Sequence, residues 1–406
     1  MSYNLHTLPN GLRIIHELTD SKVAYCGYAV NAGTRDEFAK ESGMAHLVEH
    51  LLFKGTKHRK AWHIINRMEN VGGDLNAFTS KEETIIYSAF LVEHFTRAVD
   101  LLTDIVFNST FPDEEIDKEV EVIIDEISSY KDSPSELIFD DFEALLYNGH
   151  PLGRDILGTT DYLKDFKSED VKTFTNRFYH PNNMVFFVRG NLSFNRIIKV
   201  LEKFTMSIPQ SKISHNRITP TEYTPTDKTI VKDTHQAHVM LGAPSYNAFD
   251  KRRTALYLLN NILGGPGMNS RLNVSLRERN GLVYSVESNV TSYTDTGLFS
   301  IYFGIDATDI EKAIGLVSKE LKDLMDNRLS SLQLSMAKKQ LIGQIGVASD
   351  HSESLALSMG KSFLHYDRYD THEQLCERII KLTSTDLLEV ANEVFDFDKL
   401  TTLIYK

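Results

Sequence analysis

The chain has 406 residues, of which 41% are hydrophobic and 25% are charged, and its formal net charge is −12. This length favours two or more domains, and the composition is ordinary for a globular protein. The acidic balance argues against nucleic acid as a partner, because nucleic-acid binding requires basic patches. It favours cationic partners, unless it serves only to keep the protein soluble.

No apolar run reaches the roughly 20 residues that a membrane-spanning helix requires, so no membrane partner is expected. The N-terminal residues show neither the basic nor the apolar segment of a signal peptide, which predicts a cytoplasmic location. Cys26 and Cys376 are far apart in the sequence, and neither belongs to a metal-ligand pair. A disulfide framework is therefore not expected.

The first half of the chain alternates between strand-like and helix-like patterns. Strands are predicted at residues 12–15, 23–30, 73–78, 84–91 and 184–189. Helices are predicted around residues 44–52 and at 95–107, 114–130, 135–147 and 168–178. Paired strands with helices grouped between them are typical of an α+β domain.

The second half repeats this order. Strands are predicted at residues 229–233, 238–243, 283–288, 297–303 and 400–404. Helices are predicted at residues 251–262, 310–325, 332–348, 352–363 and 384–394. The repeat predicts an α+β fold of two homologous domains from a duplication, each a mostly antiparallel sheet with helices packed on it.

A polar stretch that contains Pro209, Pro220 and Pro225 separates the two halves and shows no apolar periodicity. We therefore expect a first domain at residues 1–210, a linker at 211–226 and a second domain at 227–406. The first domain alone contains the motif described next, so it is expected to bind the metal while the second domain does a different job.

The sequence His-Leu-Val-Glu-His at residues 46–50 carries the strongest chemical signal in the chain. On a helix, His46 and His50 are neighbours on one face, roughly 5–6 Å apart at Cβ, and can bind one metal ion. Glu49 lies beside them, where a carboxylate can take a proton from a metal-activated water, and the spacing matches the inverted zinc motif. Two histidines with this spacing also occur on ordinary solvated helices, and the motif alone leaves that alternative open.

A third metal ligand is expected elsewhere in the first half, because catalytic zinc sites usually have three protein ligands and one open position. The acidic helix predicted at residues 114–130 offers Glu119 and Glu126, which lie seven residues apart and share a helix face. Taken alone, such an acidic run is typical of a solvated helix face.

Residues 43–56, Gly-Met-Ala-His-Leu-Val-Glu-His-Leu-Leu-Phe-Lys-Gly-Thr, resemble the zinc segment of the M16 metallopeptidases. This family includes the mitochondrial processing peptidase, pitrilysin and the insulin-degrading enzyme, and the resemblance covers essentially the whole chain. It implies one Zn²⁺ ion per chain, bound by His46, His50 and Glu126, the residue 76 positions after His50. It also implies that Glu119 supports the site without binding the metal.

Residues 72–80 resemble the active-site edge strand of the family, which can add an extended peptide as a further strand. The resemblance implies that this strand binds substrate through Gly73, Asn76, Ala77 and Phe78. Without the resemblance, the two adjacent glycines would indicate a simple turn.

Arg277 and Tyr284, seven residues apart, match an Arg and a Tyr in the second half of family members. They are expected to reach the scissile carbonyl and the peptide backbone, although by composition alone they would be ordinary helix and strand residues. The resemblance further implies that the two domains face each other as a clamshell around a chamber for unfolded peptides. It also implies that a chain of this length forms a homodimer.

These features predict a zinc-dependent endopeptidase that cleaves unfolded peptides or presequence-like segments, and the acidic charge indicates a preference for basic peptides. The alternative is a non-catalytic assembly or scaffold subunit of the same fold that binds zinc structurally. Glu49 distinguishes the two, because a structural site needs neither a base nor an open coordination position.

Overall fold

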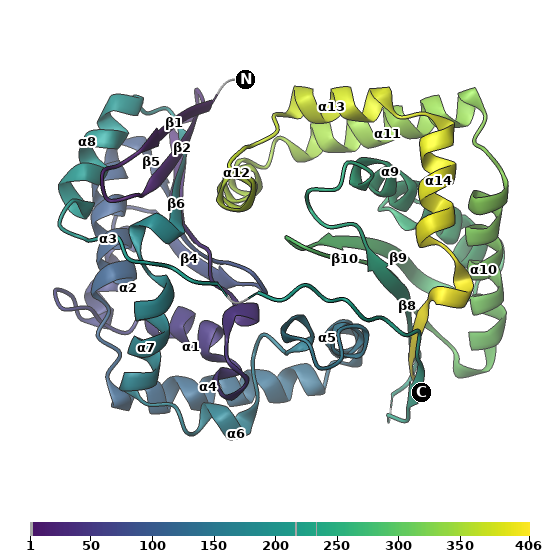
Figure 1. Ribbon diagram of the computed structural model, residues 1–406, viewed down its shortest axis with the longest axis horizontal. Coiled ribbons are helices and arrows are strands. Elements are labelled where there is room, and N and C mark those ends of the chain that lie inside the picture. Colours follow the sequence, from purple (N-terminus) through teal and green to yellow (C-terminus); the bar gives the residue numbers. More distant parts are fainter. Residues whose placement is uncertain (1–2, 216, 233) are drawn as a thin grey trace. The chain divides into compact units, whose positions relative to one another are not determined.

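The computed structural model describes residues 3–215, 217–232 and 234–406, and Figure 1 shows their secondary structure. The chain forms two compact units, each built from one β-sheet and the helices packed on it. Residues 216 and 233, which belong to the predicted linker and to the predicted strand 229–233, lie outside the described residues. Within the described ranges, no helix is long and apolar enough to cross a membrane.

The two units do not follow the sequence from end to end. Unit 1 consists of Met1–Ser128, Arg154–Arg217 and Ser349–Thr371. Unit 2 consists of Ser129–Gly153, Ile218–Ala348 and His372–Lys406. Each unit therefore includes one segment from the opposite half of the chain, which the predicted division at residues 211–226 does not take into account.

Among the described residues, unit 1 has a sheet of six strands in the order β1-β2-β6-β3-β5-β4. Neighbouring strands are antiparallel except β2 and β6, which are parallel. The strands are β1 (Tyr3–Thr7), β2 (Arg13–Leu18), β3 (Val23–Val30), β4 (Asp74–Thr79), β5 (Thr84–Leu91) and β6 (Met184–Gly190). This order places β4 at one edge of the sheet, beside β5.

Most helices of the first half cover one face of this sheet. Residues Ile14, Ile86 and Phe186 of the strands share a core with Leu47 and Leu102 of the helices. The helices with residues in this core are α1 (Met44–Leu51), α2 (Ala61–Glu69), α3 (Phe95–Asn108), α4 (Asp113–Lys131), α6 (Thr160–Leu163), α7 (Ser168–Phe178) and α8 (Phe194–Thr205).

Helix α12 (Ser352–Tyr366), from the second half of the chain, covers the opposite face of the same sheet. Successive residues of a strand point to opposite faces, so Phe187 contacts this helix although its neighbour Phe186 faces the other core. Gly360 allows the close approach, because a Cβ atom there would lie 2.5 Å from the Phe187 ring. Both faces of the sheet are therefore buried.

Unit 2 repeats the plan with a sheet of five strands, in the described residues, in the order β7-β11-β8-β10-β9. The strands are β7 (Asp227–Ile230), β8 (Ala237–Ser245), β9 (Val283–Ser292), β10 (Gly297–Ile305) and β11 (Thr401–Tyr405). Its helices are α5 (Pro134–Leu146), α9 (Arg253–Gly264), α10 (Ile310–Asp326), α11 (Ser331–Ala348), α13 (His372–Lys381) and α14 (Ser384–Val394), with a π-helical segment at Asn273–Glu278.

Helix α5, from the first half of the chain, is the counterpart of α12 in unit 2. Its Phe142 packs with Met240 and Leu403 on the sheet face opposite the main core of that unit. The Tyr405 hydroxyl donates a hydrogen bond of 2.5 Å to the carboxylate of Asp141 on the same helix. The halves of the chain thus exchange one helix each.

The predicted α+β fold with a repeated plan is confirmed. The predicted strands and helices are all present in the described residues; β3, β5, α7 and α14 have the predicted ends, and the others have shifted ends. The elements β1, α2, α6, α8 and α13 were not predicted. In α2, only Ile64 and Met68 are buried while Trp62 and Ile65 are exposed, so its apolar residues do not mark a single face.

The buried carboxylate of Glu83 connects α12 to the sheet segment of unit 1. Glu83, in the turn before β5, lies 2.6 Å from Nζ of Lys361 and 2.8 Å from Nε2 of His365. Burial acts to raise the pKa of Glu83, but the hydrogen bond from His365 and the charge of Lys361 outweigh it and lower the pKa to about 2. The contact therefore stabilises the fold only while Glu83 is ionised.

Replacing Glu83 with Gln is expected to lower the free energy of unfolding by on the order of 3 kcal/mol near pH 7, because Lys361 and His365 lose their carboxylate partner. A carboxyl with a depressed folded-state pKa stabilises above its unfolded-state pKa. This contribution is lost as the pH falls from the ordinary value of 4.5 towards about 2. Urea unfolding of the full chain at several pH values measures the difference, with the exposed Glu93→Gln as control. A difference that does not shrink at low pH would contradict this account.

Candidate metal centre

Helix α1 carries the three polar residues of the motif on a short, otherwise apolar helix of eight residues. Its Leu47, Val48 and Leu51 are buried in the core of unit 1. Their packing fixes the helix against the sheet and leaves the face with the two histidines directed away from that core. The predicted helix around residues 44–52 is thus confirmed as the support of the motif.

The structure brings the three predicted ligands together. Nε2 of His46 lies 3.9 Å, and Nε2 of His50 lies 4.0 Å, from Oε2 of Glu126 on α4. One donor atom from each of the three residues lies within 4.8 Å of the other two. A tetrahedral zinc ion with bonds of about 2.0–2.2 Å holds its ligand atoms roughly 3.3–3.6 Å apart, so small side-chain movements would complete such a site.

The chemistry of these atoms fits a zinc ion. In the described part of the chain, neither Nε2 atom makes a hydrogen bond, although α1 is largely buried. Burial, together with the nearby His50, lowers the pKa of His46 to about 4. Its imidazole is therefore neutral near pH 7, which is the form that binds metal. Two neutral imidazoles and a carboxylate are a common donor set in zinc hydrolases.

Glu119 contacts a predicted ligand rather than the centre of the cluster. Its Oε2 atom lies 3.1 Å from Nδ1 of His50, and Nζ of Lys54 lies 2.6 Å from its Oε1 atom. A carboxylate in this position favours a proton on Nδ1 and leaves the Nε2 lone pair available to a metal. Lys54 belongs to the zinc segment at residues 43–56, but the sequence did not indicate which carboxylate it contacts.

Glu49 lies on the same helix and is mostly buried. Its Oε2 atom is buried with no hydrogen-bond partner among the described residues. Burial raises the pKa of Glu49, while the nearby Thr79 and His50 act to lower it. A carboxylate with a raised pKa is suited to accepting a proton and returning it. Thr79 ends β4, and no local sequence pattern connects this strand with the candidate base.

The predicted edge strand lies at the edge of the sheet of unit 1. Gly73 immediately precedes β4, and a Cβ atom there would lie 2.8 Å from the carbonyl oxygen of Ala89, so the close approach requires glycine. Within the described residues, β4 pairs only with β5, which leaves its other edge free to add an extended peptide. The strand carries the other three predicted residues, Asn76, Ala77 and Phe78.

Arg277 and Tyr284 belong to unit 2, whereas the other predicted site residues belong to unit 1. Arg277 lies in the π-helical segment and Tyr284 on β9, and the guanidinium carbon is 5.8 Å from the ring centroid. Tyr284 is 84% exposed, so its ring and hydroxyl are available to a ligand. The fold brings the two residues together, and their role towards substrate stays a prediction.

Two family models match the chain. Residues 13–160 match the model described as insulinase, peptidase family M16, and residues 165–341 match the model described as peptidase M16 inactive domain. The uncharacterized zinc protease YmxG of Bacillus subtilis is 32% identical over 98% of this chain and 97% of its own length. An uncharacterized zinc protease of Rickettsia felis is 33% identical over 97% of this chain and 95% of its own length.

Two solved structures share the fold. A protease from Helicobacter pylori superimposes with a TM-score of 0.91 at 23% identity, covering 100% of this chain and 99% of the other. A peptidase M16 inactive domain from Pseudomonas fluorescens gives a TM-score of 0.93 at 20% identity, covering 100% and 98%. At these identities the likeness concerns the fold alone, a pair of sheet-plus-helix halves.

Replacing His50 with Ala should abolish zinc binding, because two ligands remain where a stable site usually requires three or four. Metal analysis by mass spectrometry after gel filtration measures the zinc content per chain. The matched control is His63→Ala, which removes an exposed histidine of α2 and should leave the zinc content unchanged. Equal zinc content in His50→Ala and the parent protein would remove His50 from the metal site.

Proposed function

The chain belongs to peptidase family M16, and on this basis we propose that it is a zinc-dependent endopeptidase. The observation that carries the proposal is that His46 and His50 of α1 and Glu126 of α4 form one cluster of possible metal ligands. Glu49 lies on the same helix as the two histidines. Glu49 keeps one buried oxygen without a partner among the described residues. A purely structural metal site has no use for such an oxygen, which is costly to bury.

Helices α1 and α4 both supply ligands for a zinc ion. His46, His50 and Glu126 would bind it, while Glu119 keeps the ring of His50 oriented through the contact at Nδ1. When bound in such a site, zinc lowers the pKa of a water molecule and polarises a carbonyl group.

Glu49 is assigned the proton transfers. Its carboxylate accepts a proton from the attacking water and later delivers that proton to the leaving amine. Thr79, at the end of β4, lies beside this carboxylate and acts to lower its pKa. A peptide added to the free edge of β4 would therefore lie along the strand whose last residue, Thr79, is beside the base, which places it near the group that transfers the proton.

The remaining assignments extend the proposal to the second half. Arg277 and Tyr284 would bind the scissile carbonyl oxygen and the peptide backbone, as groups placed to stabilise developing negative charge. Unfolded peptides or presequence-like segments are the proposed substrates, cleaved inside an enclosed chamber. A homodimer in the cytoplasm completes the proposal.

A second candidate function is a non-catalytic scaffold subunit that binds zinc. One observation favours it, the match of residues 165–341 to a model described as an inactive domain. The residues of the metal cluster and Glu49 all lie outside that segment, within residues 13–160. Cleavage of a quenched fluorescent peptide, measured with and without a chelator, separates the two functions, because only a zinc peptidase loses activity on chelation.

Replacing Glu49 with Gln should leave zinc bound while the cleavage rate falls on the order of 10²–10⁴-fold, the usual size of a general-base contribution. This corresponds to a barrier increase of about 3–5 kcal/mol. Zinc analysis and peptide cleavage are measured on the same sample. The control is Glu69→Gln, at an exposed position on α2, which should behave as the parent does. Parent-like cleavage by Glu49→Gln would rule out Glu49 as the base.

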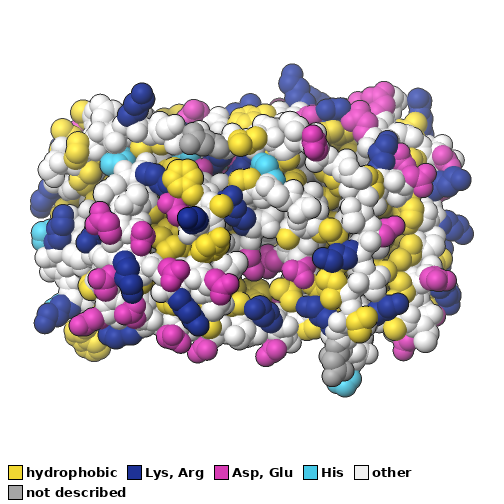
Figure 2. Space-filling model, turned by 60° about the horizontal axis from the view of Figure 1, so that its bottom comes forward, with side chains coloured by type: hydrophobic (Ala, Val, Ile, Leu, Met, Phe, Trp, Pro, Cys, Tyr) yellow, Lys and Arg dark blue, Asp and Glu magenta, His cyan; other side chains and the backbone are white. Residues whose placement is uncertain are grey.

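The net charge of −12 also motivates a preference for basic peptides. Figure 2 shows acidic and basic side chains interspersed over the visible face, so an electrostatic preference would act at short range. Peptide pairs of matched length but opposite charge should differ in kcat/KM at low salt, and the difference should shrink as salt is added. Equal values for both peptides at low salt would remove this part of the proposal.

A further inference from the structure

A buried carboxylate outside the motif holds the start of helix α1. Oε2 of Glu37 accepts a hydrogen bond of 3.1 Å from the backbone N–H of Gly43, and Oε1 accepts one of 2.8 Å from that of Ala45. Glu37 is 4% exposed, so both bonds are shielded from water. The second donor belongs to the residue immediately before His46.

This carboxylate replaces the cap that the helix itself lacks. The first N–H groups of a helix have no partner within the helix, and side-chain oxygen atoms that accept their hydrogen bonds stabilise its first turn. The residue at the capping position is Gly43, which has no side chain to accept these bonds. In a helix of eight residues, two bonds at its first turn fix a large part of its position along and about its axis.

The backbone around Glu37 is fixed from a second side. Its carbonyl oxygen accepts a hydrogen bond of 2.6 Å from Arg154, whose own carbonyl accepts one of 2.5 Å from Nζ of Lys81. Gly158 lies directly against Gly43, since a Cβ atom on Gly158 would be 2.4 Å from the Gly43 Cα. The start of α1 is therefore enclosed by the loop at residues 154–158 as well as by Glu37.

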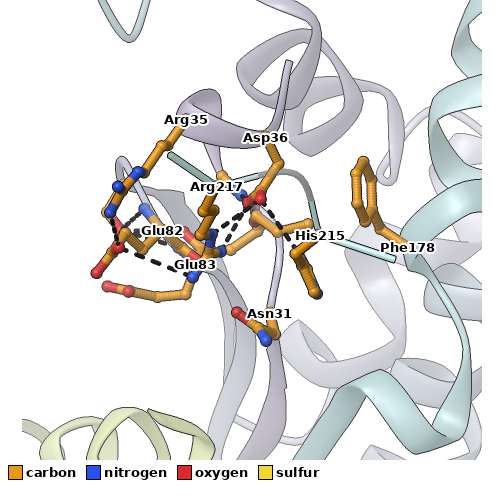
Figure 3. Close-up of polar contacts among 12 residues, drawn as sticks. Asn31, Arg35, Asp36, Glu82, Glu83, Phe178, His215 and Arg217 are labelled. Carbon is orange, nitrogen blue, oxygen red and sulfur yellow. Dashed lines mark hydrogen bonds and ion pairs between the residues drawn. The ribbon is translucent and has the colours of Figure 1, made fainter. Parts of the chain in front are cut away.

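The residue before Glu37 is anchored just as firmly, as Figure 3 shows. Asp36 accepts hydrogen bonds of 2.9 and 2.7 Å from the guanidinium of Arg217, and its Oδ1 lies 3.0 Å from Nδ1 of His215. Burial acts to raise the pKa of Asp36, but the hydrogen bonds from His215 and Arg217 outweigh it and lower the pKa. Two consecutive buried carboxylates thus bind the linker on one side and the metal helix on the other.

We propose that Glu37 is a positioning residue of the metal centre, which sets α1 so that His46 and His50 meet Glu126 of α4. The physical reason is that a metal site requires its ligands to lie within a few tenths of an ångström of their proper distances. Apolar packing of α1 permits larger adjustments, whereas two directional hydrogen bonds at its start restrict them. The role of Glu37 in catalysis rests on the proposed function. Its role in placing the ligands is tested by metal binding alone.

The test compares Glu37→Gln with Glu17→Gln. Gln has the shape of Glu but presents one acceptor oxygen and one NH₂ group, so only one of the two N–H groups keeps its partner. Glu17 is equally buried in unit 1, on β2, and pairs with Arg189 at 2.8 Å, so its variant loses a buried carboxylate away from α1. Both variants are studied as full chains.

Two readouts report on the metal centre independently of cleavage. Affinity for Zn²⁺ is measured by competition with a chelator, and ligand geometry by the visible absorption spectrum of the Co²⁺-loaded protein. Glu37→Gln should weaken Zn²⁺ binding about 10–100-fold, the usual effect of residues that orient metal ligands, and should alter the Co²⁺ spectrum. Glu17→Gln should unfold at a lower urea concentration than the parent yet keep its Zn²⁺ affinity and Co²⁺ spectrum.

Parent-like Zn²⁺ affinity and Co²⁺ spectrum in Glu37→Gln would overturn the inference and reduce Glu37 to a stabiliser of the fold. So would an equal loss of affinity in both variants. If Glu37→Gln does not fold, Glu37→Asp carries the same comparison with the charge kept and the arm shortened. A parent protein that binds Zn²⁺ but cleaves no peptide would contradict the proposed function and leave this comparison intact.

Discussion

The candidate site depends on one geometric requirement, that two imidazoles on α1 reach the same point as a carboxylate on α4. Each helix is placed by its own apolar residues, such as Val48 on α1 and Ile123 on α4. Apolar contacts are non-directional, and cores accommodate small rearrangements at modest cost. Directional contacts at His50 and at the start of α1 supply the accuracy that packing does not.

The buried carboxylates around α1 differ in how well they are satisfied. Glu37 accepts two backbone hydrogen bonds, and Glu119 lies between Lys54 and His50. Glu49 lies beside Thr79, and its Oε2 atom has no partner among the described residues. Burying a polar atom without a partner is unfavourable, so its persistence is typical of a functional site rather than of a stabilising one. The least satisfied carboxylate is thus the one assigned to chemistry.

Much of this arrangement could be predicted because it depends on the spacing of residues that are close in the sequence. The helical spacing of His46 and His50 and the apolar residues between them define α1 without any knowledge of the fold. Glu126 was harder to predict, because its position on an acidic helix is equally typical of a solvated helix face. Only the spacing known from the M16 family identified it as a ligand.

The contacts that sequence could not predict join residues that no local pattern connects. Glu37 caps a helix that begins several residues later, outside the short spacing by which capping boxes are recognised. Lys54 contacts Glu119 across the fold, and Thr79 lies near Glu49 although it is far from that residue in the sequence. The exchange of α5 and α12 could not be predicted either. An apolar helix face indicates that the helix is buried, but not which sheet it packs on.

That exchange has a consequence for how the chain is made. Translation proceeds from the N-terminus, so all strands of unit 1 leave the ribosome before α12 exists. Until then, the sheet face around Ile15 and Phe187 lacks its native cover and is the kind of surface on which nascent chains aggregate. Helix α5 must likewise wait for the strands that bury Phe142. The first half of the chain therefore cannot reach its native state before the second half is synthesised.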